Sequence, residues 1–301
     1  MKKIVFLILL LCSVNLIAAD FSIIENPGKN VEVTYKGKAL MRFMTERDSS
    51  SKERDHDTYK VYSHIIDPID GQKPITKGPG GKFTHHRGIF VGFKVTVGNT
   101  KADLWHMSKK ARNNYKKILK QEVSDEYARL TVEIDWVNDE TVLIKEERTF
   151  NFSKPEENGA FLIDLQTKLT AIAGDAKVGG DREHGGCHFR ADNEVVSTKS
   201  AKYIYPEGQD VKKSTDMPWA AMTFKLAGKD YYVQHITDPK AEKWQYSAYR
   251  DYGRFGSFPT PRDVKKGESL NYRFGFYISP GVFPENASDS FVKRYAEFTG
   301  K

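Results

Sequence analysis

The strongest constraint on the fold is a run in which apolar and polar residues alternate without a break. The apolar positions are Ala128, Leu130, Val132, Ile134 and Trp136. A period of two places alternate side chains on opposite faces of a β-strand, so one face is buried and the other is solvated. Asn138-Asp139-Glu140 supplies a turn, and residues 141–152 run back. The pattern predicts a long antiparallel hairpin with one buried face.

Further strand patterns follow along the whole chain, with short turns between them. They cover residues 31–35, 39–44, 60–66, 85–97, 161–173, 219–226, 229–236, 244–250 and 270–279. The charged, Ser-rich segment 45–57 and the Gly-rich segment 174–186 are expected to be loops.

Only the tail of the chain has a helical pattern. Phe291, Tyr295 and Phe298 recur at helical spacing, and Ser288 or Asp289 is expected to cap the start. No alternation of strands with helices occurs, which argues against a parallel sheet. The sequence therefore predicts an all-β, antiparallel β-sandwich with a short C-terminal helix, forming a single domain over residues 20–301.

The N-terminus has the pattern of a secretory signal peptide. Lys2 and Lys3 precede the apolar residues 4–11, and Ala18-Ala19 offers small residues for cleavage. We expect a signal peptide over residues 1–19, cleavage near Ala19, and a periplasmic or secreted protein. The apolar stretch is too short to span a membrane, so no stable membrane insertion is expected. Cys187 is then the only thiol, and we expect it to be buried.

The charge pattern argues against nucleic acid as a partner. The formal net charge is +7, but basic pairs such as Lys109-Lys110 are scattered among acidic residues. Such scatter is typical of a solvated surface. The chain also has no GxSxG, Walker or GxGxxG motif, which leaves several common enzyme classes without support.

Five of the eight histidines fall in three short stretches. His85-His86 lies between the Gly-rich residues 78–81 and a buried strand, where a loop presents side chains and a rigid element fixes them. His106 follows soon after, and His184 and His188 form the third stretch. If residues 187–192 are extended, His188, Arg190 and Asp192 share one face. That face should meet solvent, a partner charge or a ligand, because unpaired buried charge is costly.

Two chemistries fit these residues. In the first, a histidine and a carboxylate (Glu183 or Asp251) act as acid and base on a carbohydrate while arginines hold an anion. In the second, several histidines bind a metal, and His184 and His188 have an acceptable spacing. The intervening Gly185-Gly186 disfavours a helix there, and no HExxH or CxxC motif is present. We predict neither a metal site nor a cofactor.

Residues 246–258 interleave tyrosines, phenylalanines, arginines and glycines. Aromatic faces can stack on sugar rings, and arginines pair with carboxylates or sulfates. The alternative is an ordered loop held by its own aromatic residues.

The order and spacing of several short motifs resemble the DUF6807 family, whose members are often labelled "methane oxygenase PmoA-like". The resemblance covers residues 59–283, and its motifs begin at His85, Asp103, Gly186, Met217 and Tyr252. The oxygenase label does not fit, because the methane oxygenase subunit is a multi-pass membrane protein. The resemblance implies an exported β-sandwich similar to the galactose-mutarotase-like supersandwich. In that fold a concave sheet binds sugars and uses a histidine–carboxylate pair.

The resulting hypothesis is an exported carbohydrate-active enzyme that cleaves a glycosidic bond by hydrolysis or elimination. A non-catalytic periplasmic glycan-binding protein that uses residues 246–258, and a His-rich metal-binding protein, remain as alternatives. The sugar and the oligomeric state stay open. The hypothesis assigns catalysis to His86, His106 and His188, and substrate binding to His85, Arg87, Arg190, Tyr252 and Arg254.

Overall fold

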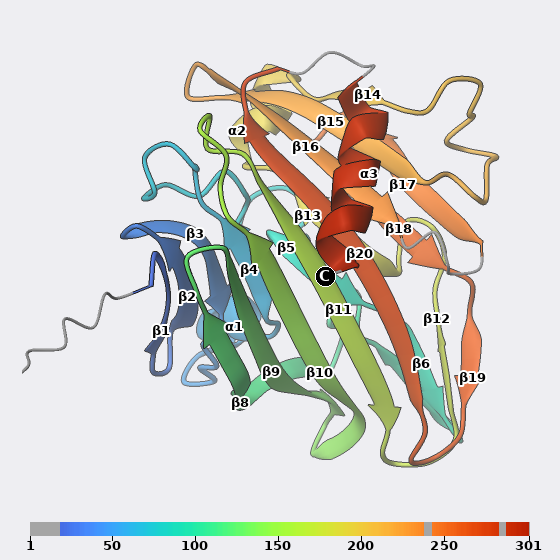
Figure 1. The fold of residues 1–301 in the computed structure, drawn as a ribbon. Helices are drawn as coiled ribbons and strands as arrows, with labels where there is room; N and C mark the ends of the chain where they lie inside the picture. Colours follow the sequence, from blue (N-terminus) through green and yellow to red (C-terminus); the bar gives the residue numbers. More distant parts are fainter. Residues whose placement is uncertain (1–18, 238–242, 283–286, 301) are drawn as a thin grey trace, which may run out of the picture.

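The computed structural model describes residues 19–237, 243–282 and 287–300. Two eight-stranded sheets pack face to face, and a smaller four-stranded sheet lies at one end (Figure 1). The strands of each sheet pair in antiparallel fashion. The predicted antiparallel sandwich is therefore confirmed. The predicted signal peptide lies outside the described residues, apart from its last residue.

The first sheet contains the N-terminal strands and four strands from later in the chain. In spatial order they are β1 (Phe21–Asn26), β2 (Asn30–Tyr35), β3 (Lys38–Met44), β4 (Tyr62–Ile65), β5 (Ile89–Gly92), β13 (Gly186–Arg190), β18 (Arg254–Pro259) and β17 (Trp244–Arg250).

The second sheet contains the longest strands. Their order is β14 (Lys202–Ile204), β15 (Trp219–Leu226), β16 (Lys229–Thr237), β20 (Ser269–Pro280), β11 (Phe161–Ala171), β10 (Thr141–Ser153), β9 (Tyr127–Asn138) and β8 (Ala111–Val123). The small sheet consists of β19 (Arg262–Val264), β12 (Ala176–Gly179), β6 (Lys94–Val97) and β7 (Thr100–Asp103).

The core between the two large sheets follows from the period-two pattern. Every apolar position of the alternating run in β9 is completely buried, as predicted. Phe43 of β3 meets Phe150 of β10 at 5.7 Å between ring centroids, so the two sheets contact each other through aromatic rings. Full burial of one such side chain contributes about 1.5–3 kcal/mol to folding.

One ion pair lies inside this apolar core. Arg148 donates from Nε and Nη2 to the carboxylate of Glu146 at 2.7 and 2.8 Å, and both side chains are at most 1% exposed. Trp136 Nε1 and the Thr167 hydroxyl donate to the same carboxylate, at 2.7 and 2.8 Å. The carboxylate is therefore satisfied by four donors, which offsets the cost of burying it.

Three predicted segments differ from the structure. The expected loop 45–57 contains helix α1 (Lys52–Thr58), because the Ser51 hydroxyl caps it by accepting from the Arg54 backbone N–H at 3.1 Å. The expected loop 174–186 contains β12, which pairs with β6 and β19. The expected strand 85–97 is split at Phe93, so that β5 joins the first sheet and β6 joins the small sheet.

The C-terminal helix α3 (Ser288–Thr299) is present as predicted and lies across the outer face of the second sheet (Figure 1). Phe291 and Tyr295 bury their rings against that face. The predicted cap is wrong: the residue before the helix is Ala287, and neither Ser288 nor Asp289 caps the backbone. Their side chains instead attach the helix to the sheet: Ser288 Oγ lies 2.7 Å from a tyrosine hydroxyl of β16, and Asp289 accepts from an indole of β15 at 2.9 Å.

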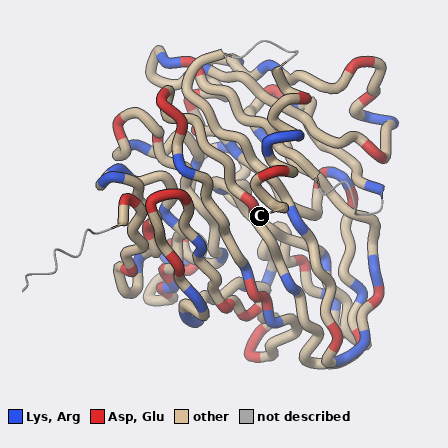
Figure 2. Tube along the Cα trace, viewed as in Figure 1, with Lys and Arg blue, Asp and Glu red and all other residues tan. Residues whose placement is uncertain are grey.

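None of the helices in the described part of the chain, including the short α2 (Glu194–Thr198), has the length and apolarity needed to cross a membrane. Acidic and basic residues are interspersed along the chain trace in Figure 2, as the scattered charge pattern predicts.

Candidate functional site

The candidate site is built on the outer face of the first sheet, where β13 lies between β5 and β18. His188 and Arg190 project to this face, while Cys187 and Phe189 belong to the core between the sheets. The predicted division into two faces is confirmed for these four residues. Both polar side chains are completely buried, because loops cover this face. Asp192 lies beyond the end of the strand, where its carboxylate accepts from the Glu194 backbone N–H at 2.9 Å.

Strand register places the polar residues of β13 beside each other and beside those of β18. His188 lies between Phe90 and Gly256, and Arg190 is paired with Arg254. A Cβ atom on Gly256 would lie 2.5 Å from Cγ of His188 and would also meet the carbonyl oxygen of Cys187. Glycine at this position therefore lets the His188 ring lie directly over β18.

His86 covers this face from the loop before β5. Its ring is 3% exposed and lies nearly parallel to that of Tyr252, at 12° and 6.0 Å between centroids. Trp105 lies 6.1 Å from His86 and 4.6 Å from His188, so one indole contacts both imidazoles. Neither ring nitrogen of His86 has a hydrogen-bond partner in the described part of the chain.

Two buried lysines hold the backbone of the His85-His86 segment. Lys60 Nζ donates to the carbonyl oxygens of His85 at 3.1 Å and Trp105 at 2.8 Å. Lys77 Nζ donates to the carbonyl oxygen of His86 at 3.1 Å. Burial, together with nearby arginines, lowers the pKa of Lys60 well below its usual value and that of Lys77 to about 7. The sequence gives no sign of either lysine, because isolated lysines are common on polar surfaces.

Four imidazoles form a continuous row from the buried face towards solvent. Ring centroids are 4.1 Å apart from His86 to His85, 4.5 Å from His85 to His106, and 5.2 Å from His106 to His184. These four residues and His188 are called the histidine cluster below. The sequence analysis did not select His184 as a site residue, although it noted its stretch.

The two outer rings of this row are each bound to a carboxylate. His106 Nδ1 lies 2.8 Å from Asp103, and His184 Nδ1 lies 2.9 Å from Asp181. The sequence analysis named Asp103 as the start of a motif but assigned neither aspartate to the site, although the repeated Asp-x-x-His spacing was a signal that could have identified both.

The three predicted arginines have different environments. Arg254 donates to the carbonyl oxygen of Glu183 at 2.5 Å and to Ser247 Oγ at 2.9 Å. Arg190 donates to the carbonyl oxygens of Ala191 and Tyr252. In both residues Nε has no partner within the residues that the structure describes.

Arg87 points away from these two arginines. It donates to three carbonyl oxygens, those of Thr84 at 2.9 Å, Asp57 at 2.6 Å and His56 at 2.8 Å. Its guanidinium also lies 4.3 Å from the centre of the Tyr59 ring. Arg87 therefore braces the histidine segment against helix α1, and the structure does not bring its guanidinium to Arg190 and Arg254.

The buried imidazoles are neutral near pH 7. Desolvation lowers the pKa of His85 to about 3, and neighbouring Lys60 and His106 add to the effect. Desolvation, with a contribution from Arg254, lowers the pKa of His86 and of His188 far below the usual range. An anion bound here would oppose both effects and raise these pKa values.

Six buried polar atoms around this face lack a partner among the described residues. They are Nδ1 and Nε2 of His86, Nδ1 of His188, Nε1 of Trp105, and Nε of Arg190 and Arg254. We call these five residues the floor residues. The indole and the two guanidinium nitrogens can only donate, and neutral His86 adds one more N–H. An unmade hydrogen bond at a buried donor costs about 1–3 kcal/mol, so this arrangement favours a ligand with oxygen acceptors.

The carboxylates near the cluster are occupied. Glu183 accepts from Arg250 Nη2 at 2.6 Å and from the Tyr249 hydroxyl, and it lies 3.6 Å from Arg254. Burial alone would raise the pKa of Glu183, but these donors hold it below the usual value. Within the described ranges, no group of three or more His, Cys, Asp or Glu side chains is placed to hold a metal ion.

The aromatic residues of segment 246–258 mostly face the core. Tyr246 and Phe255 are completely buried, and Phe258 is 3% exposed. Tyr252 is the member of this segment that reaches the histidine cluster. Tyr246, Phe255 and Phe258 therefore offer no exposed face for stacking on a sugar ring.

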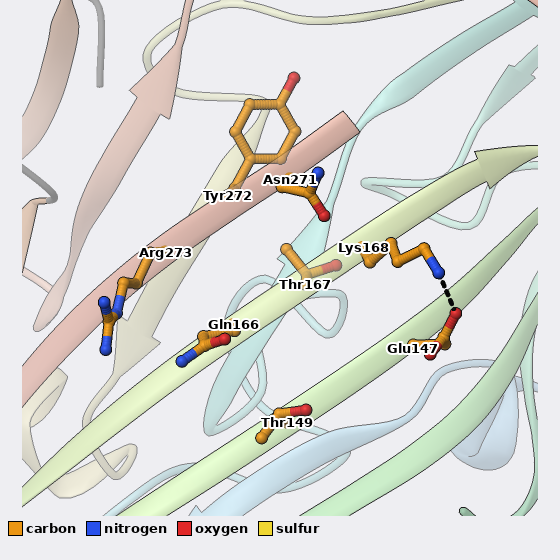
Figure 3. Close-up of a pocket in the computed structure, with 8 residues that line it drawn as sticks. All are labelled: Glu147, Thr149, Gln166, Thr167, Lys168, Asn271, Tyr272 and Arg273. Carbon is orange, nitrogen blue, oxygen red and sulfur yellow. Dashed lines mark hydrogen bonds and ion pairs between the residues drawn. The ribbon is translucent and has the colours of Figure 1, made fainter. Parts of the chain in front are cut away.

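Two cavities lie elsewhere, on the outer face of the second sheet. One has a volume of about 380 Å³ and is crossed by the ion pair between Lys168 and Glu147 at 2.7 Å (Figure 3). The other has a volume of about 670 Å³ and contains the pair between Arg273 and Asp164 at 2.7 Å. The charged side chains named in these cavities already form ion pairs with each other, whereas the floor residues have buried polar atoms without a partner. A cavity of about 290 Å³ beside the site is lined in part by Lys60 and Tyr62.

The fold and site define an antiparallel β-sandwich protein with a buried, donor-rich polar cluster on one sheet. The chain belongs to the DUF6807 family, a family of unknown function, whose model matches residues 30–292. The predicted family is thus confirmed. No curated protein matches the chain.

Several solved structures are similar to the chain at low identity. A mutant of the heparan sulfate lyase HepC from Pedobacter heparinus is 12% identical, with a TM-score of 0.40 over 88% of this chain and 36% of that one. A galactose mutarotase-like protein from Lactobacillus casei is 7% identical, with a TM-score of 0.38 over 87% and 100%. A polysaccharide lyase is 12% identical, with a TM-score of 0.35 over 88% and 33%. The chain thus spans about a third of the length of the two lyases, and these similarities assign no role to any residue.

Proposed function

We propose that this protein is a carbohydrate-active enzyme that cleaves glycosidic bonds in an acidic glycan, by elimination. The observation that carries the proposal is the set of unpartnered N–H donors on four of the floor residues, His86, Trp105, Arg190 and Arg254. A sugar carboxylate supplies the oxygen acceptors that these donors lack, and guanidinium groups suit that partner by shape and charge.

Binding of a uronate carboxylate would also prepare the reaction. Donors on both oxygens stabilise the negative charge that develops when the neighbouring C5 proton leaves. A histidine takes that proton, the electron pair forms a C4–C5 double bond, and the C4–oxygen bond breaks. A protonated group then gives a proton to the departing oxygen, so the step needs no oxidant or cofactor.

Hydrolysis fits the residues less well. Most glycoside hydrolases use two carboxyl groups, one as acid and one as base or nucleophile. Here Asp103 and Asp181 are bound to histidines, and Glu183 is bound to Arg250 and Tyr249. The free acid–base groups of the site are imidazoles.

The direct test is incubation of the purified protein with uronate-containing polysaccharides, with and without sulfate, and with neutral polysaccharides. Elimination produces an unsaturated uronate, detected by its ultraviolet absorbance, together with one new reducing end per cleavage. We expect both signals on acidic substrates only. Reducing ends without the absorbance would establish hydrolysis, and binding without either signal would establish a glycan-binding protein.

Two arginine variants test whether the floor residues bind the carboxylate of the substrate. Arg190→Lys and Arg254→Lys keep the charge but lose the planar donor set, so KM for the acidic substrate should rise at least about tenfold. Arg262→Ala is a matched control, because Arg262 is an exposed arginine of β19 in the small sheet. If the two lysine variants retain the wild-type KM, the floor residues do not bind the carboxylate.

We also propose that the protein is exported, which rests on the residue pattern of positions 1–19. The mass of the mature protein recovered from an expressing bacterium tests this. A mass that includes residues 1–19 would exclude cleavage.

A further inference from the structure

The two outer rings of the histidine cluster, His106 and His184, are held by the same turn used twice. In each turn the aspartate stands three residues before the histidine. Asp103 Oδ1 accepts from the backbone N–H groups of Trp105 and His106, at 3.1 and 2.9 Å. Asp181 Oδ1 accepts in the same way from the residues two and three positions further on, at 2.9 and 3.1 Å. Each carboxylate also binds Nδ1 of its histidine. The two loops come from different parts of the chain, yet they place the rings 5.2 Å apart.

This arrangement fixes the tautomer of both rings. An ionised carboxylate can only accept hydrogen bonds, so the shared proton resides on Nδ1. In the neutral ring, Nε2 then carries the free lone pair. Both rings therefore present the same atom for proton transfer to a ligand.

His106 and His184 differ from the floor residues in their exposure to solvent. The side chains of His106 and His184 are 33% and 40% exposed, whereas His86 is 3% and His188 0% exposed. An acid–base group must recover its starting protonation state in every turnover, and this is simplest where water reaches the ring. The floor residues lack that access and are suited to binding.

We infer that His184 and His106 are the acid–base pair of the site, and that Asp103 and Asp181 are positioning residues which hold them. The inference rests on the proposed function and deepens it. In the elimination, neutral Nε2 of one ring takes the C5 proton while the other ring, protonated, gives its proton to the departing glycosidic oxygen. The pair ends with one proton, now on the other ring, and exchange with water restores the starting state.

The charges around the pair come from several elements. They are Lys94 of β6, 3.9 Å from Asp181; Lys60 behind His85; Glu183 in the same turn as His184; and Arg254 of β18. These groups remain in all variants below, so changes in the spectra report on the pair itself.

The first experiment needs no substrate. The imidazole nitrogens of ¹⁵N-histidine-labelled protein are observed by NMR at neutral pH. We expect His106 and His184 in the Nδ1–H tautomer, because each aspartate carboxylate accepts a hydrogen bond at Nδ1. A wild-type spectrum with either ring in the Nε2–H tautomer would overturn the inference.

The aspartates are tested in the same spectra. Asp181→Asn should move the proton of His184 towards Nε2, since an amide can donate to Nδ1. Asp210→Asn is the matched control: Asp210 accepts from the Lys212 N–H at 2.9 Å and pairs with Lys213, three residues on, at 3.5 Å. If zinc ions shift both rings at one equivalent, the pair is a metal site and the inference is overturned.

Measured values of kcat distinguish a failure of this inference from a failure of the proposed function. His184→Asn should lower kcat at least about 100-fold, as expected for loss of a general acid or base, with KM changed less than about threefold. Wild-type kcat in His184→Asn, with an active wild-type protein, would overturn the inference and leave the proposed function standing. A wild-type protein that cleaves no acidic glycan would refute the proposed function itself.

Discussion

The ring of Tyr252 lies almost parallel to that of His86, at 12° and 6.0 Å between centroids, and both rings are largely buried. Arg190 and Arg254 lie 5.4 and 5.8 Å from the centre of the same tyrosine ring. Tyr252 thus connects the loop histidine to the two arginines of the sheet, and its aromatic face is the shared contact.

The first prediction concerns this contact. Tyr252→Leu should lower stability by about 1 kcal/mol beyond the loss of buried area, because the stacking and cation–π contacts disappear. Tyr252→Phe keeps the ring and should lie within about 0.5 kcal/mol of wild type. Urea denaturation of the wild-type protein and the two variants measures the difference in the free energy of unfolding. Equal stability of the Leu and Phe variants would show that the ring contacts contribute nothing.

The second prediction tests the close approach at β18. Gly256→Ala should destabilise the protein by about 1–3 kcal/mol, because the new Cβ would meet Cγ of His188 and the Cys187 carbonyl. Gly174→Ala is the control, since its Cβ would meet only the Cγ1 methyl group of Val97, at 3.1 Å. Thermal unfolding compares the two variants. Similar melting temperatures would contradict the described packing of His188 over β18.

The third prediction concerns the core ion pair. Glu146→Gln should cost about 3–5 kcal/mol, because it leaves the Arg148 guanidinium buried without its counter-charge. Glu147→Gln removes only an exposed pair with Lys168 and should change stability by less than about 1 kcal/mol. Chemical denaturation distinguishes them. A small effect of Glu146→Gln would mean that water reaches this pair.

The fourth prediction is a pH dependence. Burial lowers the pKa of Lys77 to about 7, from 10.5 for a free lysine. Between these pH values the unfolded state holds a proton that the folded state lacks, so stability contributed by this group rises with pH. Relative to Lys77→Met, the wild-type protein should gain stability from about pH 7 to 10.5. Lys101→Met, at an exposed lysine of β7, should show no such trend. A wild-type advantage that falls with pH would contradict the burial of Lys77.

The fold was largely predictable because its signals are local. The alternation in 128–136 identifies β9 directly, and the aromatic spacing of the tail identifies α3. The split of the 85–97 run was not predictable, since a continuous apolar run cannot show that its two halves pair with different sheets.

The site was predictable only in part. His86, His188, Arg190, Arg254 and Tyr252 do come together, while Arg87, from the same motif, turns towards Tyr59. The lysines at 60 and 77 owe their role to backbone carbonyls 9 to 45 residues away, which no sequence pattern encodes.

Strand β13 has the core on one side and the candidate site on the other, and it is a single backbone thick. Cys187 and Phe189 pack inward, while His188 and Arg190, their immediate neighbours, point outward. No other element separates the core from the candidate site at this strand. A substitution that changes the side-chain volume at Cys187 or Phe189 should shift the backbone of β13. That shift would also move the His188 imidazole and the Arg190 guanidinium on the opposite face. We therefore expect a substitution at any of these four residues to change both the stability of the core and the geometry of the candidate site.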